Sequence, residues 1–340
     1  MFAGIRLRVL LLGSQSLIGR YVLASLERAG HTVICFGQNS ESPANASTSQ
    51  VRLAGNPRDP AVLREGITSS KPDGAIVCVE FSGRLQSRIP SGDLVRVVDF
   101  DYLSQIFKTI SAAAPSAKTV FTSSALFYKR AGNYKQEGRP VMYNENNQLD
   151  DSTNAAKAVI QFEALVQSQV RAGADASIAR LGGLYAKEGV FGRAILMPVL
   201  EKQKLLLPDP GERFCCPIYV EDGARAILYL LERASAGEVY NVVDDEPVTL
   251  RGLVQIAADI FGSTPPVAIP YFAAKYLSPR AYEAVADFLP NAAPVSNEKL
   301  RKFEFDFAFS DARAGLSRIK ELCEVGNSEP AEAATNHKST

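Results

Sequence analysis

The sequence predicts an α/β protein, a doubly wound parallel sheet of the Rossmann type with a smaller, mostly helical C-terminal substrate subdomain. Three observations support this class. Apolar runs of strand length recur through the first half of the chain, and most are followed by a helical pattern. The runs are continuously apolar, as expected of strands buried on both faces of a parallel sheet. The alternation starts with the first strand, which is typical of nucleotide-binding sheets.

The expected elements follow one another in a regular order. The first run, "RVLLLG", precedes a helical pattern, and the second, "TVICFG", precedes a loop rich in Ser, Asn and Pro at 38–50. The run "GAIVCV" precedes a helical stretch near 93–113. "KTVFTSS" leads through a long loop into a helix at 153–171, which "ASIARLG" follows. A short strand, "EVYNVV", is expected at 238–243.

The same patterns suggest domain bounds. We expect residues 1–185 to form the dinucleotide-binding domain, with 217–243 returning to it. Residues 186–216 and 244–323, where the pattern loosens and Pro-rich connections appear, are expected to form the substrate-binding subdomain. Residues 324–340 contain almost no large apolar side chain, which predicts a disordered tail.

Composition argues against several classes of function. The 340 residues carry 37 basic and 37 acidic side chains, which gives no electrostatic argument for nucleic acid or an anionic membrane. The N-terminal apolar run is too short for an export segment and indicates a buried strand, and no other run approaches a membrane span. The presence of only two histidines argues against a zinc site or a histidine-activated nucleophile. Five cysteines without ligand spacing predict reduced core residues and a cytoplasmic protein.

The first strand runs into a glycine turn, "GSQSLIG", at the start of a helix. Gly13 permits the tight bend, and Gly19 lets the helix pack close to the strand. The free N–H groups and the positive dipole end of the helix attract a pyrophosphate. The middle position, where a glycine would let the backbone approach the phosphates, is Ser16. The motif indicates a dinucleotide site, and the alternative is a purely structural turn.

The end of the second strand should separate NAD from NADP. An Asp or Glu there would bind the ribose 2′-hydroxyl, whereas an Arg would accommodate a 2′-phosphate. The chain has Gly37, Gln38, Asn39 and Ser40 instead. Since neither marker is present, the cofactor could be NAD or NADP.

Further stretches occur in a fixed order along the chain. They are "LAGNPRDPAVL", "FTSSALFY", "STNAAK", "ARLGGLYA", "CPIYVEDGARAILYLLE", "VYNVVDDEPVTLRGLVQIAADIFG" and "SNEKLRKFEFDFAFSDARAGL". Together with the glycine turn, over about residues 7–320, they resemble the extended short-chain dehydrogenase/reductase family. This is the NAD-dependent epimerase/dehydratase group, which acts largely on nucleotide sugars.

The resemblance implies roles for individual residues. Ser124 would orient the substrate hydroxyl, Lys157 would hold the nicotinamide ribose, and Asn56 would lie near the adenine. The cofactor-binding set is then Gly13, Ser14, Ser16, Leu17, Ile18, Gly19, Gln38, Asn56 and Lys157. The general-base tyrosine, expected four residues before the lysine, has no counterpart because its position is Thr153.

Thr153 changes the expected chemistry. A phenol whose pKa is lowered by a nearby lysine can take a proton from a sugar hydroxyl, and positions four apart share a helix face. A threonine hydroxyl is too weak an acid and too short. Thr153 or Ser152 could simply cap the helix, and Lys157 could be a solvated helix lysine. Tyr128 and Tyr143 are the candidate substitutes for proton transfer.

Two arginines could recognise a substrate. Arg180 and Arg213 could each hold a diphosphate bidentately, or each could form a surface ion pair. The resemblance and these residues together lead us to expect an NAD(P)-dependent epimerase/dehydratase or reductase-like oxidoreductase with an atypical proton-transfer residue, acting on a nucleotide sugar or a related hydroxy or keto compound. The alternative is a catalytically degenerate dinucleotide sensor or partner-binding protein. The resemblance further implies a small-molecule substrate and a homodimer.

Overall fold

A computed structural model of the chain describes residues 6–37, 49–80, 95–96, 99–129, 135–136, 139–208, 214–277 and 293–326. Its centre is a seven-stranded sheet with the order β14-β10-β7-β4-β1-β2-β3. The strands are β1 (Arg8–Leu12), β2 (Thr32–Gly37), β3 (Gln50–Ala54), β4 (Gly74–Val77), β7 (Lys118–Ser124), β10 (Ala176–Leu181) and β14 (Val239–Val242). Every pairing in this sheet is parallel, so all carboxyl ends of the strands meet at one edge.

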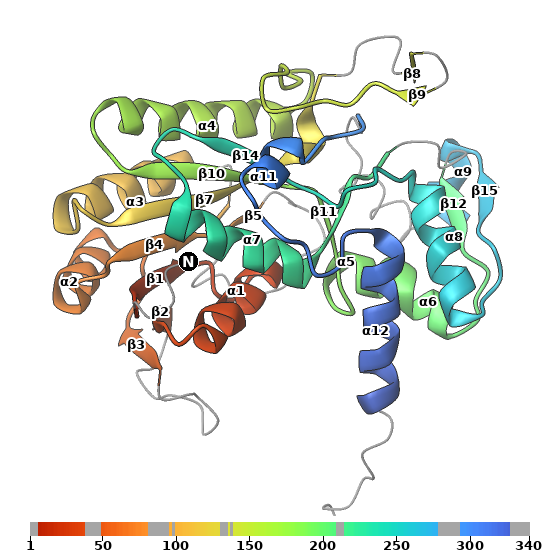
Figure 1. The fold of residues 1–340 in the computed structure, drawn as a ribbon, viewed down its shortest axis with the longest axis horizontal. Helices are drawn as coiled ribbons and strands as arrows, with labels where there is room; N and C mark the ends of the chain where they lie inside the picture. Colours follow the sequence, from red (N-terminus) through yellow and green to blue (C-terminus); the bar gives the residue numbers. More distant parts are fainter. Residues whose placement is uncertain are drawn as a thin grey trace, which may run out of the picture.

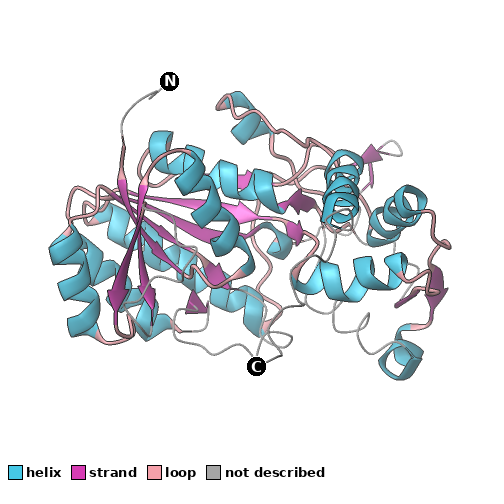
Figure 2. Ribbon diagram, turned by 90° about the horizontal axis from the view of Figure 1, so that it is seen from below, coloured by secondary structure: helices cyan, strands magenta, loops and turns pink. Residues whose placement is uncertain are grey.

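Helices cover both faces of the sheet (Figures 1 and 2). Val9 and Leu11 of β1 pack into one core with α1 (Leu17–Arg28) and α7 (Val220–Arg233). Leu10 and Leu12, which point the other way, pack into a second core with α2, α3 and α4. These three helices are α2 (Pro60–Ser70), α3 (Phe100–Ala113) and α4 (Asn154–Arg171). Burial on both faces explains why the strands are apolar at every position.

The strand order reverses between β1 and β4. The chain moves outward from β1 to β2 and β3, then returns to place β4 on the other side of β1. The two strands are held in register, with Leu12 beside Val77. In open α/β sheets, ligands bind outside the carboxyl ends of the strands at such a reversal. The glycine turn after β1 lies at this point.

The C-terminal half adds smaller elements beside the large sheet. Two parallel pairs form, β11 (Gly183–Tyr185) with β13 (Pro217–Tyr219) and β12 (Leu206–Pro208) with β15 (Val267–Ile269). The helices are α5 (Gly189–Phe191), the π-helical η2 (Gly192–Leu196), α6 (Met197–Leu200), α8 (Leu250–Phe261), α9 (Tyr271–Leu277), α11 (Glu298–Lys302) and α12 (Ala312–Gly326). Short elements elsewhere are η1 (Ala125–Phe127) and the strands β5 (Val79–Glu80), β6 (Val95–Arg96), β8 (Lys135–Gln136) and β9 (Arg139–Pro140).

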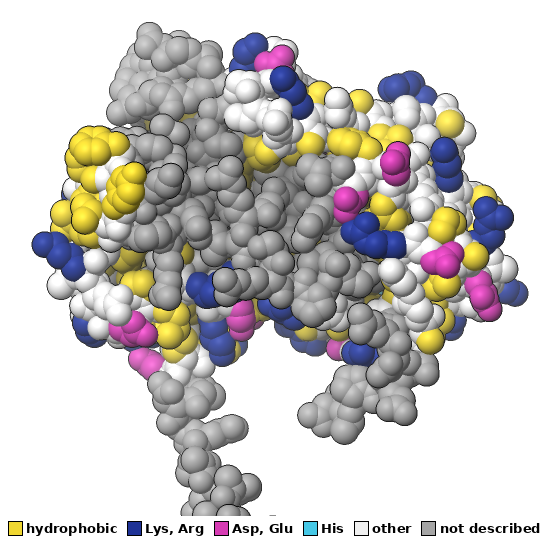
Figure 3. Space-filling view, turned by 180° about the vertical axis from the view of Figure 1, so that it is seen from behind, with side chains coloured by type: hydrophobic (Ala, Val, Ile, Leu, Met, Phe, Trp, Pro, Cys, Tyr) yellow, Lys and Arg dark blue, Asp and Glu magenta, His cyan; other side chains and the backbone are white. Residues whose placement is uncertain are grey.

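Exposed apolar side chains gather near α9. Phe272 and Tyr276 are each 80% exposed, and Leu277 is 62% exposed. Figure 3, which shows the face turned away in Figure 1, has hydrophobic side chains grouped at the end of the molecule that carries α9 and β15. Elsewhere on that face, basic and acidic side chains are interspersed.

The predicted fold class is confirmed, and several bounds differ. The helix expected near 93–113 starts only at Phe100, because residues 95–96 form a strand. Helix α12 continues beyond residue 324 to Gly326, so the start of the expected tail is helical, and 327–340 lie outside the described residues. None of the five cysteines is in a disulfide, as expected, and all are buried except Cys323, which is half-buried. No helix among the described residues is long and apolar enough to span a membrane.

Candidate dinucleotide site

The turn between β1 and α1 has little room for side chains at its two glycines. Gly13 has a φ of +82°, and a Cβ there would collide with the carbonyl oxygen of Cys78, just after β4. A Cβ on Gly19 would collide with the carbonyl oxygen of Gly13. Only glycine satisfies both constraints, since a positive φ and a close backbone approach each exclude other residues. The turn is thus compressed against the strand reversal.

Ser16 occupies the middle of this turn as the N-cap of α1. Its Oγ accepts a hydrogen bond from Gly19 N at 3.0 Å and donates one to Gly13 O at 2.7 Å. The hydroxyl therefore satisfies one of the amides that open a helix. Ser14 and Ser16 are only 4% and 5% exposed.

The first turn of α1 still offers donors to an anion. Leu17 and Ile18 follow the cap, and their N–H groups have no acceptor one turn earlier within the helix. No acidic residue stands in the first turn, and the positive end of the helix dipole lies there. These features fit the pyrophosphate of a dinucleotide.

Asn56 lies beyond the end of β3, on the side of the sheet where the adenine is expected. It is exposed, and its Oδ1 accepts from Arg58 N at 3.0 Å within a turn. Gln38, the other residue expected near the adenosine, lies outside the described residues.

Ser124 ends β7 at the carboxyl edge of the sheet. It is 4% exposed, and its Oγ accepts from Leu126 N at 3.2 Å, which starts η1. β7 is separated from β1 only by β4, so Ser124 and the glycine turn lie at the same edge. The arrangement places a hydroxyl at the same edge of the sheet as the glycine turn.

Thr153 caps helix α4, as one of the two alternatives predicted. Its Oγ1 accepts from Ala156 N at 3.1 Å, and it has extended backbone angles. The hydroxyl is thus bonded to the helix end, and the residue as a whole is exposed. Lys157, one turn further, is also exposed. The geometry gives Thr153 a structural role that is complete without catalysis.

Tyr128 does not fit a proton-transfer role. It is fully buried, donates its hydroxyl to Asn241 Oδ1 at 2.7 Å and accepts from Arg180 at 2.7 Å. Burial raises the pKa of Tyr128 to about 12, although the Arg180 charge lowers it. A buried phenol with such a pKa stays protonated at neutral pH, so the geometry disfavours the expected role as a base.

Arg180 is likewise held inside the protein, contrary to the expected diphosphate contact. Its Nε and NH2 donate to the two carboxylate oxygens of Glu163, at 2.9 and 2.6 Å. The side chains are only 8% and 9% exposed. Burial lowers the pKa of Arg180, but the hydrogen bonds and charge of Glu163 raise it above its ordinary value overall. The pair fixes α4 against β10 and leaves the fork unavailable to substrate.

Tyr143 and Arg213 complete the expected set. Tyr143 is 5% exposed and is held by backbone hydrogen bonds, from its N–H to Pro294 O and from Ser296 N to its own carbonyl, both at 2.8 Å. Its ring lies 6.2 Å from that of Tyr128. Arg213 lies outside the described residues.

Sequence reasoning missed a buried polar row that crosses the sheet. Ser123, Arg180 and Asn241 lie side by side in β7, β10 and β14. Ser123 Oγ also donates to Glu163 at 2.5 Å. The sequence feature that could have revealed this row is Glu163, an acidic residue on the otherwise apolar face of α4 beside Phe162.

A second buried acid, Asp244, follows β14. It is 2% exposed and accepts from the Tyr185 hydroxyl at 3.0 Å and from Tyr219 N at 3.4 Å. Burial raises the pKa of the Asp244 carboxyl well above its usual range, and the nearby carboxylates of Asp222 and Asp311 raise it further.

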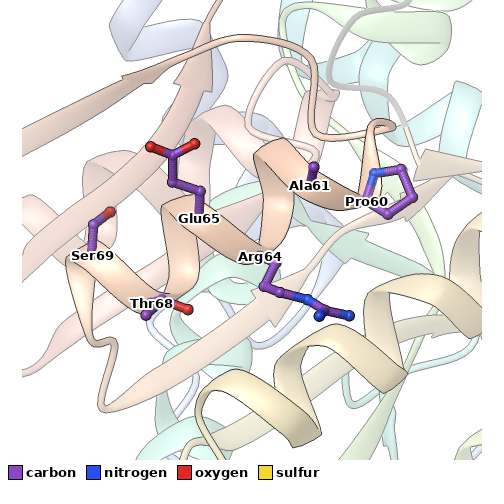
Figure 4. Close-up of a pocket in the computed structure, with 6 residues that line it drawn as sticks. All are labelled: Pro60, Ala61, Arg64, Glu65, Thr68 and Ser69. Carbon is purple, nitrogen blue, oxygen red and sulfur yellow. The ribbon is translucent and has the colours of Figure 1, made fainter.

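An open groove lies away from this edge, along the exposed face of α2 (Figure 4). Its lining residues are Pro60, Ala61, Arg64, Glu65, Thr68 and Ser69, all from that one helix. None of the residues expected to bind cofactor or substrate lines it.

Solved structures with the same fold cover nearly the whole chain. dTDP-glucose 4,6-dehydratase from Bacillus anthracis, in complex with NAD, matches with a TM-score of 0.72 and 14% identity, over 95% of this chain and 98% of that one. UDP-glucose 4-epimerase from Thermotoga maritima, with UDP-glucose, has a TM-score of 0.70 and 16% identity, over 94% and 99%. Human epimerase family protein SDR39U1, with NADPH, has a TM-score of 0.70 and 17% identity, over 92% and 99%.

Sequence comparison gives the family. Uncharacterized protein YLL056C from Saccharomyces cerevisiae is 24% identical over 302 residues, which cover 87% of this chain and 93% of the yeast protein. The model of the NAD dependent epimerase/dehydratase family matches residues 9–243, well over half of the chain. This match runs from within β1 to just past β14 and includes the glycine turn. The chain belongs to the NAD-dependent epimerase/dehydratase family.

Proposed function

We propose that this protein is a nicotinamide-dinucleotide-dependent oxidoreductase that acts on a nucleotide sugar or a related hydroxy or keto compound. The observation that carries the proposal is the turn after β1. Gly13 and Gly19 leave no space for a Cβ, and the first turn of α1 presents the amides of Leu17 and Ile18 at the strand reversal. Such a turn fits a pyrophosphate, and solved structures of similar fold contain NAD or NADPH.

The chemistry of the bound cofactor would be hydride transfer at its nicotinamide ring. In this proposal Leu17 and Ile18 hold the phosphates, Ser124 orients a substrate hydroxyl, and Lys157 binds the nicotinamide ribose. Thr153 transfers no proton, since its hydroxyl caps α4. Tyr143 is the tyrosine that the proposal retains for proton transfer, because Tyr128 is fully buried with a raised pKa.

The substrate class rests on similarity alone. UDP-glucose 4-epimerase and dTDP-glucose 4,6-dehydratase share the fold over nearly their whole lengths. We also propose a homodimer and a reducing compartment such as the cytoplasm. The five free cysteines support the latter, and analytical ultracentrifugation tests the former.

The first experiment is native mass spectrometry of the purified chain, followed by calorimetric titration with NAD, NADH, NADP and NADPH. We expect binding of at least one of them at micromolar concentration. A Gly19→Ala variant should lose it. Absence of binding by the folded wild type overturns the proposal. Turnover is then measured by nicotinamide absorbance with UDP- and dTDP-sugars, for the wild type and for Tyr143→Phe.

A second function is favoured by one observation, the cap formed by Thr153. A degenerate member would bind the dinucleotide without turnover and serve as a sensor or partner-binding protein. Wild-type protein that binds a dinucleotide but converts no sugar nucleotide supports this function. Turnover that Tyr143→Phe abolishes supports the enzyme.

A further inference from the structure

The sequence has no marker for NAD or NADP at the end of β2, but the neighbouring strand carries an arginine near that point. Arg52 lies in β3, paired with Cys35 of β2, and the pairing continues to Gly37 beside Ala54. Figure 1 shows both strands at this end of the sheet, next to α1. Arg52 is therefore two residues from the strand end where a dinucleotide ribose would lie.

Arg52 faces the side of the sheet that carries α1. Gln50 and Arg52 are two apart in one strand and share a face. Gln50 Nε2 donates to Glu27 of α1 at 2.7 Å, which identifies that face. The phosphate-binding turn begins the same helix, so Arg52 and the turn flank the same side of the carboxyl edge.

The guanidinium of Arg52 is weakly bound where it lies. Its one hydrogen bond to a described residue, from NH2 to Gln50 Oε1, is long at 3.4 Å. Its Nε–H is buried without an acceptor among the described residues. A buried unpaired donor on a cation is costly, so an anion within reach is strongly favoured.

Reach and selectivity both fit a phosphate on the ribose. Two strand residues rise by about 6.6 Å, a span that the arginine side chain can cover. No acidic residue occurs from Cys35 to Ser40, and the next one, Glu41, is four residues beyond the end of β2 and outside the described residues. No carboxylate therefore stands directly after β2, where it would bind a 2′-hydroxyl and repel a 2′-phosphate.

The other arginine close to the end of β3 is already engaged. Arg58 donates to Asp99 at 2.8 Å, and its guanidinium lies 4.6 Å from the centre of the Tyr102 ring. Arg58 is thus neutralised in a surface ion pair, whereas Arg52 forms no ion pair with a described residue.

We propose that Arg52 swings from Gln50 to bind the 2′-phosphate of the adenosine ribose, which makes NADP(H) the cofactor of this protein. The proposal rests on the proposed dinucleotide site and adds its specificity. Arg52 contributes a planar fork that binds a phosphate bidentately, as a lysine at the same position would not.

The test titrates NADPH, NADH, adenosine 2′,5′-bisphosphate and 5′-AMP into wild type, Arg52→Gln, Arg52→Lys and the surface control Arg64→Gln. We expect wild type to prefer the two 2′-phosphorylated ligands. Arg52→Gln should weaken these two roughly tenfold or more and leave NADH within about twofold. Arg52→Lys should weaken them less, and Arg64→Gln should behave as wild type. Circular dichroism confirms that each variant is folded.

The outcomes separate this inference from the dinucleotide site itself. Equal or tighter binding of NADH by wild type overturns it, and so does an equal loss of both dinucleotides in Arg52→Gln. If wild type binds neither dinucleotide but binds the bisphosphate through Arg52, NADP(H) is not the cofactor, and both the inference and the proposed function fail. If no ligand binds, both fail.

Discussion

Replacing Glu163 with Gln should destabilise the protein more than any exposed charge replacement. The change removes the charge from one partner of a buried pair and leaves the Arg180 guanidinium without its counter-ion. Both side chains are less than a tenth exposed, so water cannot take the place of the carboxylate. Ser123 also loses the charged acceptor of its 2.5 Å hydrogen bond.

The magnitude follows from the contacts. Breaking a buried ion pair by removing one partner typically costs 3–5 kcal/mol. Gln can still accept one hydrogen bond, and Arg180 keeps the Tyr128 hydroxyl at 2.7 Å. We therefore expect Glu163→Gln to lower the free energy of unfolding by about 3 kcal/mol, at the lower end of that range.

Urea unfolding followed by far-ultraviolet circular dichroism measures the loss, since the chain has no Trp for fluorescence. The matched control is Glu298→Gln, whose partner Lys302 lies one turn away, with side chains 69% and 74% exposed. It should cost at most about 0.5 kcal/mol. A loss below about 1 kcal/mol for Glu163→Gln, or one equal to the control, would refute the structural role of the pair.

Three further outcomes are expected. Thr153→Ala should lower the free energy of unfolding by about 1 kcal/mol, and Thr153→Ser should restore most of it, both measured by urea unfolding. Gly13→Ala should abolish dinucleotide binding in calorimetry, because its Cβ would meet the Cys78 carbonyl at a positive φ. The free energy of unfolding of Asp244→Asn, relative to that of the wild type, should increase as the pH rises. The pKa of Asp244 is raised in the folded protein, so its contribution is fully present only below about pH 4, the unfolded pKa, and declines above it. Unfolding curves measured from pH 4 to 9 should diverge, and parallel curves would contradict the raised pKa.

The sheet could be predicted because its signal is local. Strands buried on both faces must be apolar at every position, and Val9 to Leu12 show this in the sequence. The glycine turn could be predicted equally well, because a positive φ at Gly13 leaves few alternatives to glycine. Both features depend on residues that are close in the sequence.

The fate of Arg180 could not be predicted for the opposite reason. Whether an arginine at a strand end faces solvent or a partner depends on residues distant in the chain. Its acceptors come from Glu163 in α4 and from Tyr128 after η1, and Asn241 of β14 completes the row. Only the order of the strands brings these residues together, and no single segment of the sequence determines that order.

A comparison of the capping hydroxyls shows that helix capping alone can account for Thr153. In each of three helices, a Ser or Thr accepts from the amide three residues on: Ser16 from Gly19, Thr153 from Ala156 and Thr249 from Gly252. α8, which Thr249 caps, contains no residue expected in the site, so capping alone accounts for a hydroxyl at that position. The same account suffices for Thr153.

Capping does not suffice for the turn before α1. A cap requires only Ser16, whereas the glycines on either side of Ser16 are required by the close approach of β1, α1 and β4. The glycine turn is therefore the part of the proposed site whose geometry is not explained by helix capping alone.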